Sequence, residues 1–189
     1  MLNIGVLISG GGTNLQAIID ETKSGGINGT VKLVISNKEN AYGLERARLS
    51  GIKAVYETNE DKIIGLLKEN NIDLIVLAGY LKIITPKFVD EFRNKIINIH
   101  PSLIPSFCGK GYYGEKVHQG VIDYGAKVTG ATVHFVDEGA DTGAIIMQET
   151  VNVEQDDDAK SLAKRVLEVE HRILKESIRL FCENKLSIQ

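Results

Sequence analysis

Five short apolar runs alternate with amphipathic stretches through the first hundred residues, and this alternation constrains the fold more than any other feature. The apolar runs are 3–9, 30–36, 54–56, 73–78 and 95–100, and the amphipathic stretches are 14–24, 41–50, 60–70 and 85–92. Nearly continuous apolar strands separated by helices are typical of a parallel sheet that helices cover on both faces. Because such crossovers are right-handed, we expect a doubly wound, mostly parallel, Rossmann-like α/β fold with three αβα layers.

The second half of the chain has a different pattern. Residues 127–137 and 143–153 form longer, partly alternating runs, which we expect to extend the sheet as further strands. A long amphipathic helix is predicted from about Asp158 to about Phe181. Neither a linker nor an internal repeat is visible, so we expect one domain spanning residues 1–189.

Composition and charge narrow the class of protein and of partner. The 189 residues are 43% hydrophobic and 25% charged, as in ordinary globular proteins, and the net charge of −3 gives no basic footprint for a nucleic acid. Cys108 and Cys182 have no metal or redox spacing, which fits a reducing compartment. No basic leader is visible, and no apolar run approaches the roughly 18 residues of a membrane span. We therefore expect a cytoplasmic monomer or homodimer that acts on small molecules, without nucleic acid or membrane partners.

A glycine-rich loop follows the first strand in the segment LISGGGTNLQAII. Glycines let the backbone approach a ligand closely, and the following helix start offers free N–H groups to a phosphate. Leu15 occupies the place of the third glycine of a dinucleotide fingerprint, and the lysine of an ATP-binding loop is missing. We expect a monophosphate site here, with Thr13 or Asn14 capping the helix; the alternative is a tight turn without a ligand.

Asn98 and His100 end the fifth strand, two residues apart, immediately before Pro101. Their side chains point the same way, at the edge where parallel strands form a ligand crevice. An amide and an imidazole can both donate to the oxygen that becomes negative during acyl or formyl transfer to an amine. Asp141, on a turn after the next strand, can orient His100, favour its charged form and relay a proton. The alternative is that the pair only holds the following loop.

These segments together resemble the phosphoribosylglycinamide formyltransferases, which use 10-formyltetrahydrofolate in purine synthesis. The resemblance is carried, in order along the chain, by ISGGGTNLQAII, SNKENAYGLERA, LAGYLKIITPKFV, NIHPSLIPSF, TVHFVDEGADTG and EVEHRI. It implies a single formyltransferase domain, with a ribonucleotide phosphate site in the N-terminal half and a folate site in the C-terminal half. The implied reaction moves the formyl group of 10-formyltetrahydrofolate to the amine of 5-phosphoribosylglycinamide.

The resemblance also implies roles for individual residues. The implied catalytic trio is Asn98, His100 and Asp141, and the implied substrate-binding residues are Gly11, Gly12, Thr13, Asn14 and Glu170. The implied folate-binding residues are Leu81, Lys82, Ile83, Ile84, Asn98, Val136, Asp137, Glu138, Gly139, Ala140 and Asp141. His134 is an additional candidate that faces the site. In place of the proline-glycine pair expected after the HPS segment, this chain has Cys108-Gly109 and then GKGYYG, so the conformation of that loop is not implied.

Glu170 is notable independently of the resemblance. It lies near the middle of the apolar arc of the last helix, and a charge turned toward the core requires a partner. The resemblance implies that it binds the glycinamide amine or amide, and the alternative is an internal partner. Among the remaining signals, we expect His118 on the surface of a helix, and Thr85 and Asp156–Asp158 at helix starts. No histidine pair has the spacing of a metal site, so we expect no metal.

Three other functions remain to be weighed. A formyltetrahydrofolate hydrolase could use the same trio with water as the acceptor, but that class needs no phosphate loop. A methionyl-tRNA formyltransferase would require a further tRNA-binding domain. A noncatalytic nucleotide-binding module leaves Asn98, His100 and Asp141 without a purpose. The transferase is the main hypothesis, and the hydrolase is its alternative.

Overall fold

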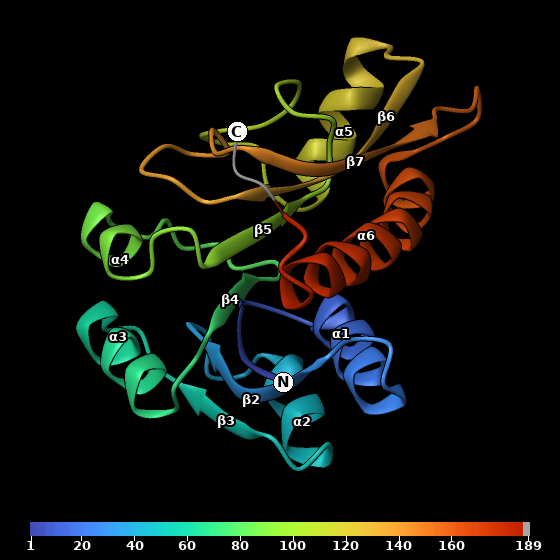
Figure 1. Ribbon diagram of the computed structural model, residues 1–189. Coiled ribbons are helices and arrows are strands. Elements are labelled where there is room, and N and C mark those ends of the chain that lie inside the picture. Colours follow the sequence, from blue (N-terminus) through green and yellow to red (C-terminus); the bar gives the residue numbers. More distant parts are fainter. Residues whose placement is uncertain (187–189) are drawn as a thin grey trace.

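The apolar runs form the strands of one sheet in the computed structural model, which describes residues 1–186 (Figure 1). The strands are β1 (Leu2–Ile8), β2 (Gly29–Ser36), β3 (Lys53–Tyr56), β4 (Leu74–Leu77), β5 (Ile96–His100), β6 (Val128–Phe135) and β7 (Ile145–Asn152). Their order is β3-β2-β1-β4-β5-β6-β7. The pairs from β3 to β5 are parallel, whereas β6 and β7 add antiparallel pairs. The expected doubly wound, mostly parallel α/β fold is therefore confirmed.

Within residues 1–186, six helices cover the two faces of the sheet. They are α1 (Thr13–Ser24), α2 (Tyr42–Leu49), α3 (Glu60–Glu69), α4 (Pro86–Glu91), α5 (Glu115–Tyr124) and α6 (Ala159–Cys182). The predicted caps of α4 and α6 are confirmed: Thr85 accepts the N–H of Phe88, and Asp158 accepts those of Lys160 and Ser161. Among the described residues, no helix combines the length and apolar character required to cross a bilayer.

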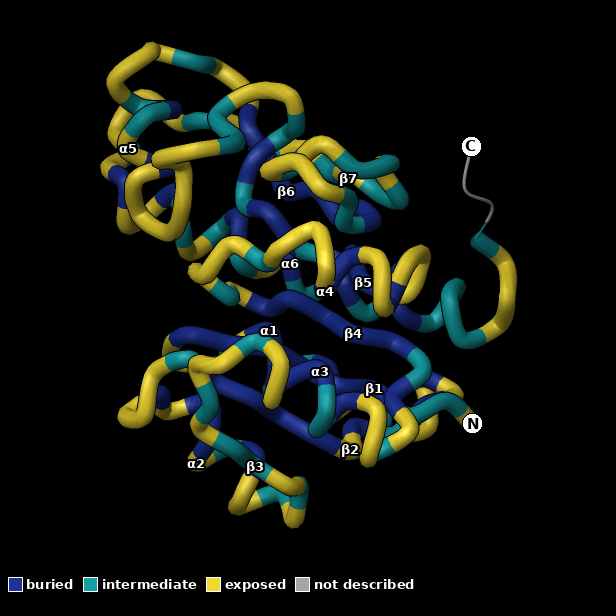
Figure 2. Tube along the Cα trace, turned by 90° about the vertical axis from the view of Figure 1, so that its left-hand side faces the viewer, coloured by how far each residue is buried: buried dark blue, intermediate teal, exposed yellow. Residues whose placement is uncertain are grey.

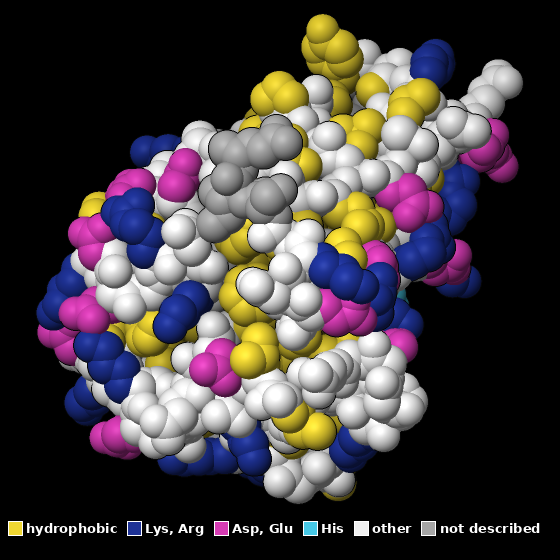
Figure 3. Space-filling model, in the orientation of Figure 1, with side chains coloured by type: hydrophobic (Ala, Val, Ile, Leu, Met, Phe, Trp, Pro, Cys, Tyr) yellow, Lys and Arg dark blue, Asp and Glu magenta, His cyan; other side chains and the backbone are white. Residues whose placement is uncertain are grey.

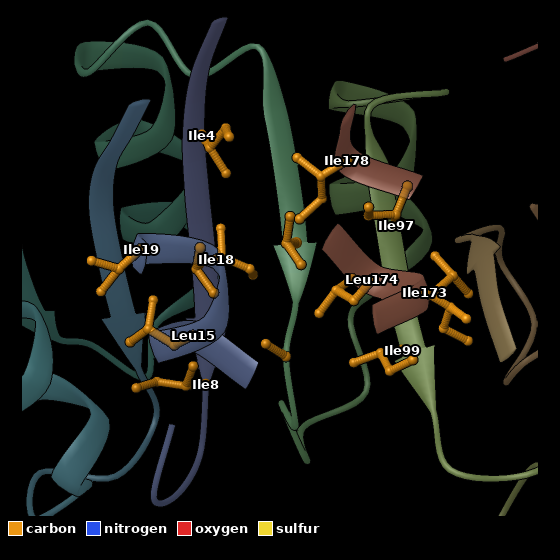
Figure 4. Packing of buried hydrophobic residues seen from close by; sticks show 14 of the residues in the cluster. Ile4, Ile8, Leu15, Ile18, Ile19, Ile97, Ile99, Ile173, Leu174 and Ile178 are labelled. Carbon is orange, nitrogen blue, oxygen red and sulfur yellow. The ribbon is translucent and has the colours of Figure 1, made fainter. Parts of the chain in front are cut away.

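Two apolar clusters lie on opposite faces of the sheet. The larger one joins β1 to α1 and α6, where Ile4 and Ile8 of the strand pack with Ile18 and Ile178 (Figure 4). The smaller one places Leu7 of the same strand against α3 and α4. Alternate side chains of β1 therefore enter different clusters, which explains why the strand is apolar at nearly every position. The central strands are consequently buried, while the loops and outer helix faces are exposed (Figure 2).

Charged side chains of both signs are spread over the surface. Lysine and arginine side chains are interspersed with aspartate and glutamate over the face seen in Figure 3, and no extended area of one charge appears on that face. This pattern agrees with the small net charge of −3.

The last strands are shorter than the sequence predicts. β6 ends at Phe135 and β7 begins at Ile145, so that residues 136–144 form a loop. A Cβ atom on Gly143 would lie 1.8 Å from the carbonyl oxygen of Phe135, so only glycine permits this close return of the chain. Asp141 adopts a left-handed conformation with φ of 59°. The loop therefore leaves the sheet just where Asp141 can turn back toward β5.

Candidate active site

A cavity of about 610 Å³ opens at the carboxyl ends of β1, β4 and β5. This is the edge at which open parallel sheets bind ligands, because the connections on either side diverge there. The residues that line it come mainly from the glycine loop, from the loops that follow β4, β5 and β6, and from α6. Among the expected site residues, the lining includes Gly11, Gly12, Thr13, Asn14, Leu81, Lys82, Ile83, Ile84, Asn98, His100, His134, Val136, Asp137, Gly139, Ala140, Asp141 and Glu170.

The glycine loop forms one end of the cavity. A Cβ atom on Gly12, which has a positive φ of 71°, would lie 2.7 Å from the Cα of Gly43, so that position requires glycine. Gly12 itself is the N-cap of α1, and it has no side chain that could accept a hydrogen bond from the first turn. The expected capping by Thr13 or Asn14 is therefore wrong. The uncapped N–H groups remain free to bind an anion.

Asn14 and Glu170 form a buried pair beside this loop. The Nδ2 of Asn14 donates to Glu170 Oε2 over 2.8 Å, and both residues are at most 8% exposed. Burial raises the pKa of the Glu170 carboxyl, and the hydrogen bond from Asn14 opposes that rise. The expectation that Glu170 has a partner is thus confirmed, and the partner is an internal amide. The Oδ1 of Asn14 is buried without a hydrogen bond among the described residues.

Asn98 is held from the neighbouring antiparallel strand. It lies directly opposite His134 in the β5–β6 register, and its Nδ2 is 3.1 Å from His134 Nε2. The other nitrogen of His134 is 2.7 Å from the carbonyl of Phe135, which requires a proton on Nδ1. In the neutral ring, Nε2 therefore accepts from Asn98. This leaves one amide N–H of Asn98 with only a long, 3.5 Å contact to Asp141.

His100 lies between a backbone carbonyl oxygen and the Asp141 carboxylate. Its Nε2 is 3.0 Å from the carbonyl oxygen of Phe107, and its Nδ1 is 3.6 Å from Asp141 Oδ2. Burial lowers the pKa of His100, and this outweighs the opposing effects of the Phe107 carbonyl and the Asp141 charge. The imidazole of the unliganded protein is therefore neutral near pH 7, with its proton on Nε2. Asp141 favours the charged ring as expected, but less strongly than burial disfavours it.

Asp141 connects the trio to the loop after β5. Its Oδ2 accepts the backbone N–H of Gly109 over 2.9 Å, and its Oδ1 is 3.6 Å from His134 Nε2. Burial alone would raise the pKa of Asp141, but hydrogen bonding and the two imidazoles together hold it below 3.8. The carboxylate is consequently ionised at neutral pH. The sequence prediction that Asp141 lies beside His100 and Asn98 is confirmed.

The other end of the cavity is more open. Leu81 and Ile83 are 48% and 73% exposed, so that apolar side chains meet solvent at the cavity wall. Lys82 also lines the cavity, and its ammonium donates to the carbonyl of Thr58 over 2.7 Å. Glu138 differs from the other expected wall residues: it is outside the lining and pairs with Arg93 over 2.6 Å.

Some lining residues were missed by sequence reasoning. His118 was expected on the surface, yet it is only 4% exposed and lines the cavity. Burial lowers the pKa of His118 to about 4. Tyr112 and Tyr113, in the GKGYYG loop, also line the cavity. The apolar arc of α5, with Val117 and Val121 fully buried, was the available signal that His118 turns inward.

Comparison with known proteins identifies the family of this chain. The formyl transferase family model matches residues 2–178. The phosphoribosylglycinamide formyltransferase of Haemophilus influenzae is 43% identical, over 100% of this chain and 91% of that protein. The chloroplastic enzyme of that name from Arabidopsis thaliana is 40% identical over 97% of this chain, which spans only 66% of that relative's length.

Solved structures give the same result. The crystal structure of glycinamide ribonucleotide transformylase 1 from Symbiobacterium toebii superposes with a TM-score of 0.94. It is 43% identical in sequence, over 100% of this chain and 91% of that one. The chain therefore belongs to the formyl transferase family and, within it, to the phosphoribosylglycinamide formyltransferases.

Proposed function

We propose that this protein transfers the formyl group of 10-formyltetrahydrofolate to the amine of 5-phosphoribosylglycinamide, releasing tetrahydrofolate. The observation that carries the proposal is the cluster of Asn98, His100 and Asp141 between a glycine loop and an apolar wall. A single formyltransferase domain spanning residues 1–189 would perform the reaction in the cytoplasm, as a monomer or homodimer. It would act on small molecules alone and would require no metal.

The two ends of the cavity fit two different ligands. The free N–H groups of the glycine loop suit the substrate phosphate, and the nearby Glu170 carboxylate suits hydrogen-bond donors of the same molecule. The apolar wall at Leu81 and Ile83 suits a flat aromatic ring such as the pterin. The two reacting groups would then meet in the middle, beside Asn98.

Asn98 would stabilise the oxygen that becomes negative. The neutral amine attacks the formyl carbon, a carbon–nitrogen bond forms, and the carbonyl electron pair moves to the oxygen. Since His134 accepts only one N–H of Asn98, the other is available to that oxyanion. His134 would thereby act as a positioning residue, which keeps the amide rotated with its nitrogen toward the cavity.

His100 and Asp141 would manage the proton that the amine loses. In the resting protein, the lone pair of His100 Nδ1 faces the ionised Asp141 at 3.6 Å, and a proton arriving there binds between them. The imidazolium formed in this way would help to stabilise the oxyanion. The proton then passes to the folate nitrogen as its bond to the formyl carbon breaks.

The test is to incubate the protein with 10-formyltetrahydrofolate, with and without phosphoribosylglycinamide. Tetrahydrofolate formation that requires the amine, with a matching amount of N-formyl product, is expected. Consumption of the folate that ignores the amine would instead identify a hydrolase. Absence of any consumption would leave the protein as a binding module and would contradict the proposal.

A further inference from the structure

The loop that follows β5 contacts two members of the trio through its backbone. The carbonyl oxygen of Phe107 is 3.0 Å from His100 Nε2, and the N–H of Gly109 donates to Asp141 Oδ2 over 2.9 Å. Both groups belong to residues 101–109, which form neither helix nor strand. A loop presents its backbone groups at fixed positions only where other parts of the protein hold it. The geometry of the trio therefore depends on whatever fixes this loop.

A row of three side chains crosses the sheet from the site to the sheet edge. His100 lies directly opposite Thr132 in the β5–β6 register, and Thr132 lies directly opposite Gln148 in the β6–β7 register. Directly opposite residues of antiparallel strands share one face of a sheet. Because β7 is the last strand, Gln148 lies at the edge, where it is exposed and outside the cavity lining.

Thr132 and Gln148 hold the loop from this face of the sheet. The Thr132 hydroxyl donates to the carbonyl of Ser102 over 2.6 Å and accepts the N–H of Ile104 over 3.1 Å. The Nε2 of Gln148 donates to the carbonyl of Ile104 and to the Thr132 hydroxyl, each over 3.0 Å. Within residues 1–186, the other side chains from outside the loop that bond to residues 101–109 belong to the trio itself. Thr132 and Gln148 are therefore the side chains that tie the loop to the sheet.

Hydrogen bonds inside the loop connect these ties to Phe107. The hydroxyl of Ser102 donates to the carbonyl of Ser106 over 2.6 Å, and the N–H of Ser106 donates to the carbonyl of Leu103 over 2.9 Å. These bonds close a turn immediately before Phe107. Phe107 has a positive φ of 50°, a conformation that a residue other than glycine keeps only where its surroundings impose it. The position of its carbonyl therefore depends on how firmly the turn is tied to the sheet.

We propose that Gln148 is a positioning residue for His100, and that it acts from the sheet edge through Thr132 and the loop. The inference rests on the proposed function, because it concerns the residue that would take up a proton in that reaction. The Gln148 amide fixes the carbonyl of Ile104 and orients the Thr132 hydroxyl. The turn then keeps the carbonyl of Phe107 at the His100 ring.

The tautomer of His100 is what this arrangement controls. With the Phe107 carbonyl in place, the proton of the neutral ring is on Nε2, and the lone pair of Nδ1 faces Asp141 at 3.6 Å. If the loop loosens, the proton can occupy Nδ1 and donate to the Asp141 carboxylate instead. Nδ1 then has no lone pair for the proton that the amine loses. Loss of the Gln148 amide should therefore lower kcat and leave substrate binding intact.

The kinetic test replaces Gln148 by three residues of similar length. Gln148→Met removes the amide, Gln148→Lys keeps a donor, and Gln148→Glu presents only acceptors to the Ile104 carbonyl at neutral pH. We expect kcat for formyl transfer to fall about fivefold in the methionine variant, at least as far in the glutamate variant, and less than about twofold in the lysine variant. KM for both substrates should stay unchanged. The control is Gln119→Met on the exposed face of α5, where the side chain bonds to Asp123 and not to the loop.

Nitrogen NMR of the imidazole rings gives a readout that a loss of stability alone would not move. At neutral pH, the wild-type His100 should carry its proton on Nε2, and a fraction on Nδ1 should appear in Gln148→Met but not in Gln119→Met. His134 is the internal reference, because its Nδ1 proton faces the carbonyl of Phe135, which is outside the loop. His100→Asn identifies the signals of His100, and circular dichroism verifies that each variant folds.

The outcomes distinguish the positioning role from the proposed function. An unchanged kcat in Gln148→Met, or a reduced kcat with an unchanged His100 tautomer, would overturn the positioning role. A raised KM for the folate with a normal kcat would assign Gln148 to cosubstrate binding and would also overturn it. A wild-type protein without transfer activity would contradict the proposed function, and the His100 tautomer would then still test the action of Gln148 on the ring.

Discussion

The two ends of the cavity are built in opposite ways. At the glycine-loop end, Asn14 and Glu170 are 7% and 8% exposed and bind one another, and the loop is locked by Gly12 against Gly43. At the other end, Leu81 and Ile83 are 48% and 73% exposed, and they lie on a connection without regular structure. The closed end is pre-organised for a small charged ligand, whereas the open end can adapt to a larger apolar one.

The two ends of the cavity differ because different parts of the fold build them. The closed end is made by β1, α1 and α6. Side chains of these elements form the larger apolar cluster, so packing in the core fixes the geometry of this end. The open end is made by loops that only touch the core. Asn98 and His100 stand between them on β5, and Asp141 reaches them from a loop. Substitutions at the two ends should therefore change different kinetic constants.

The largest effect should come from the trio, which belongs to neither end. Asp141→Asn removes the charge that faces His100 and, with it, the proposed partner of His100 in proton transfer. We expect kcat to fall by about 10² to 10⁴-fold, while KM for both substrates changes little. Steady-state kinetics measures this, with the exposed Asp156→Asn as the matched control. A normal kcat with a raised KM for the folate alone would move Asp141 from the chemistry to the open end.

Asn98→Ala should follow closely. It removes the proposed donor to the developing oxyanion, for which we expect a loss of about 10² to 10³-fold in kcat. Asn98→Asp has nearly the same size but presents only acceptors at neutral pH, so it should be no more active than the alanine variant. A nearly active Asn98→Asp enzyme would show that the amide only holds the loop.

The burial of His118 in the cavity wall can be tested through the stability of the protein. The pKa of His118 is about 4 in the folded protein, against 6.5 for the ordinary side chain. Because the folded value is the lower one, His118 contributes its full share of stability above pH 6.5, and this share is lost as the pH falls toward 4. The loss is at most about 3 kcal/mol in the free energy of unfolding.

His118→Leu should remove this part of the pH dependence. Urea unfolding at pH 7.5 and pH 4.5 gives the difference for each protein, and the difference should be smaller for the variant. His171→Leu is the matched control, because His171 is only half-buried. An identical pH dependence in the wild-type and His118→Leu proteins would show that His118 is solvated in solution.

The smallest effects should separate the two ends. Asn14→Ala leaves the Glu170 carboxyl without its hydrogen bond, so the pKa of that carboxyl should rise further. We expect KM for phosphoribosylglycinamide to increase about tenfold. The acid limb of kcat/KM for that substrate should also move to higher pH, while KM for the folate stays unchanged.

Ile83→Ala is the corresponding substitution at the open end, and it serves as the control for Asn14→Ala. It shortens an apolar side chain of the open end, so KM for the folate should rise a few-fold, about what two or three lost methyl-sized contacts contribute, without any change in KM for the amine. If both substitutions raised both constants, the two ends would be coupled and the comparison would fail.

Much of the fold could be predicted because it follows from local patterns. The side chains of β1 are buried on both faces of the sheet, so the strand is apolar at nearly every position and is easily recognised in the sequence. Thr85 and Asp158 are typical capping residues, and they mark where α4 and α6 begin. Asn98 and His100 could be placed because a strand that ends just before Pro101 carries both side chains toward one crevice. Glu170 could be recognised as a site residue because it is a carboxylate within the apolar arc of α6.

The rest depended on contacts between distant segments. The backbone N–H of Gly109 that holds Asp141, and the opposition of His134 to Asn98, come from strand register and loop return, which periodicity does not encode. The cap of α1 was misjudged because Gly12 takes a left-handed conformation against Gly43, 31 positions away in the sequence. His118 was misjudged because a short amphipathic helix after a glycine-rich loop gives a weak burial signal.

A crystal structure with phosphoribosylglycinamide and a folate analogue that cannot release its formyl group would locate both ligands directly. We predict the phosphate on the glycine loop, the pterin against Leu81 and Ile83, and the amine within hydrogen-bond reach of the Asn98, His100 and Asp141 cluster. Reversed ligands, or an amine bound more than about 6 Å from all three side chains, would contradict the account.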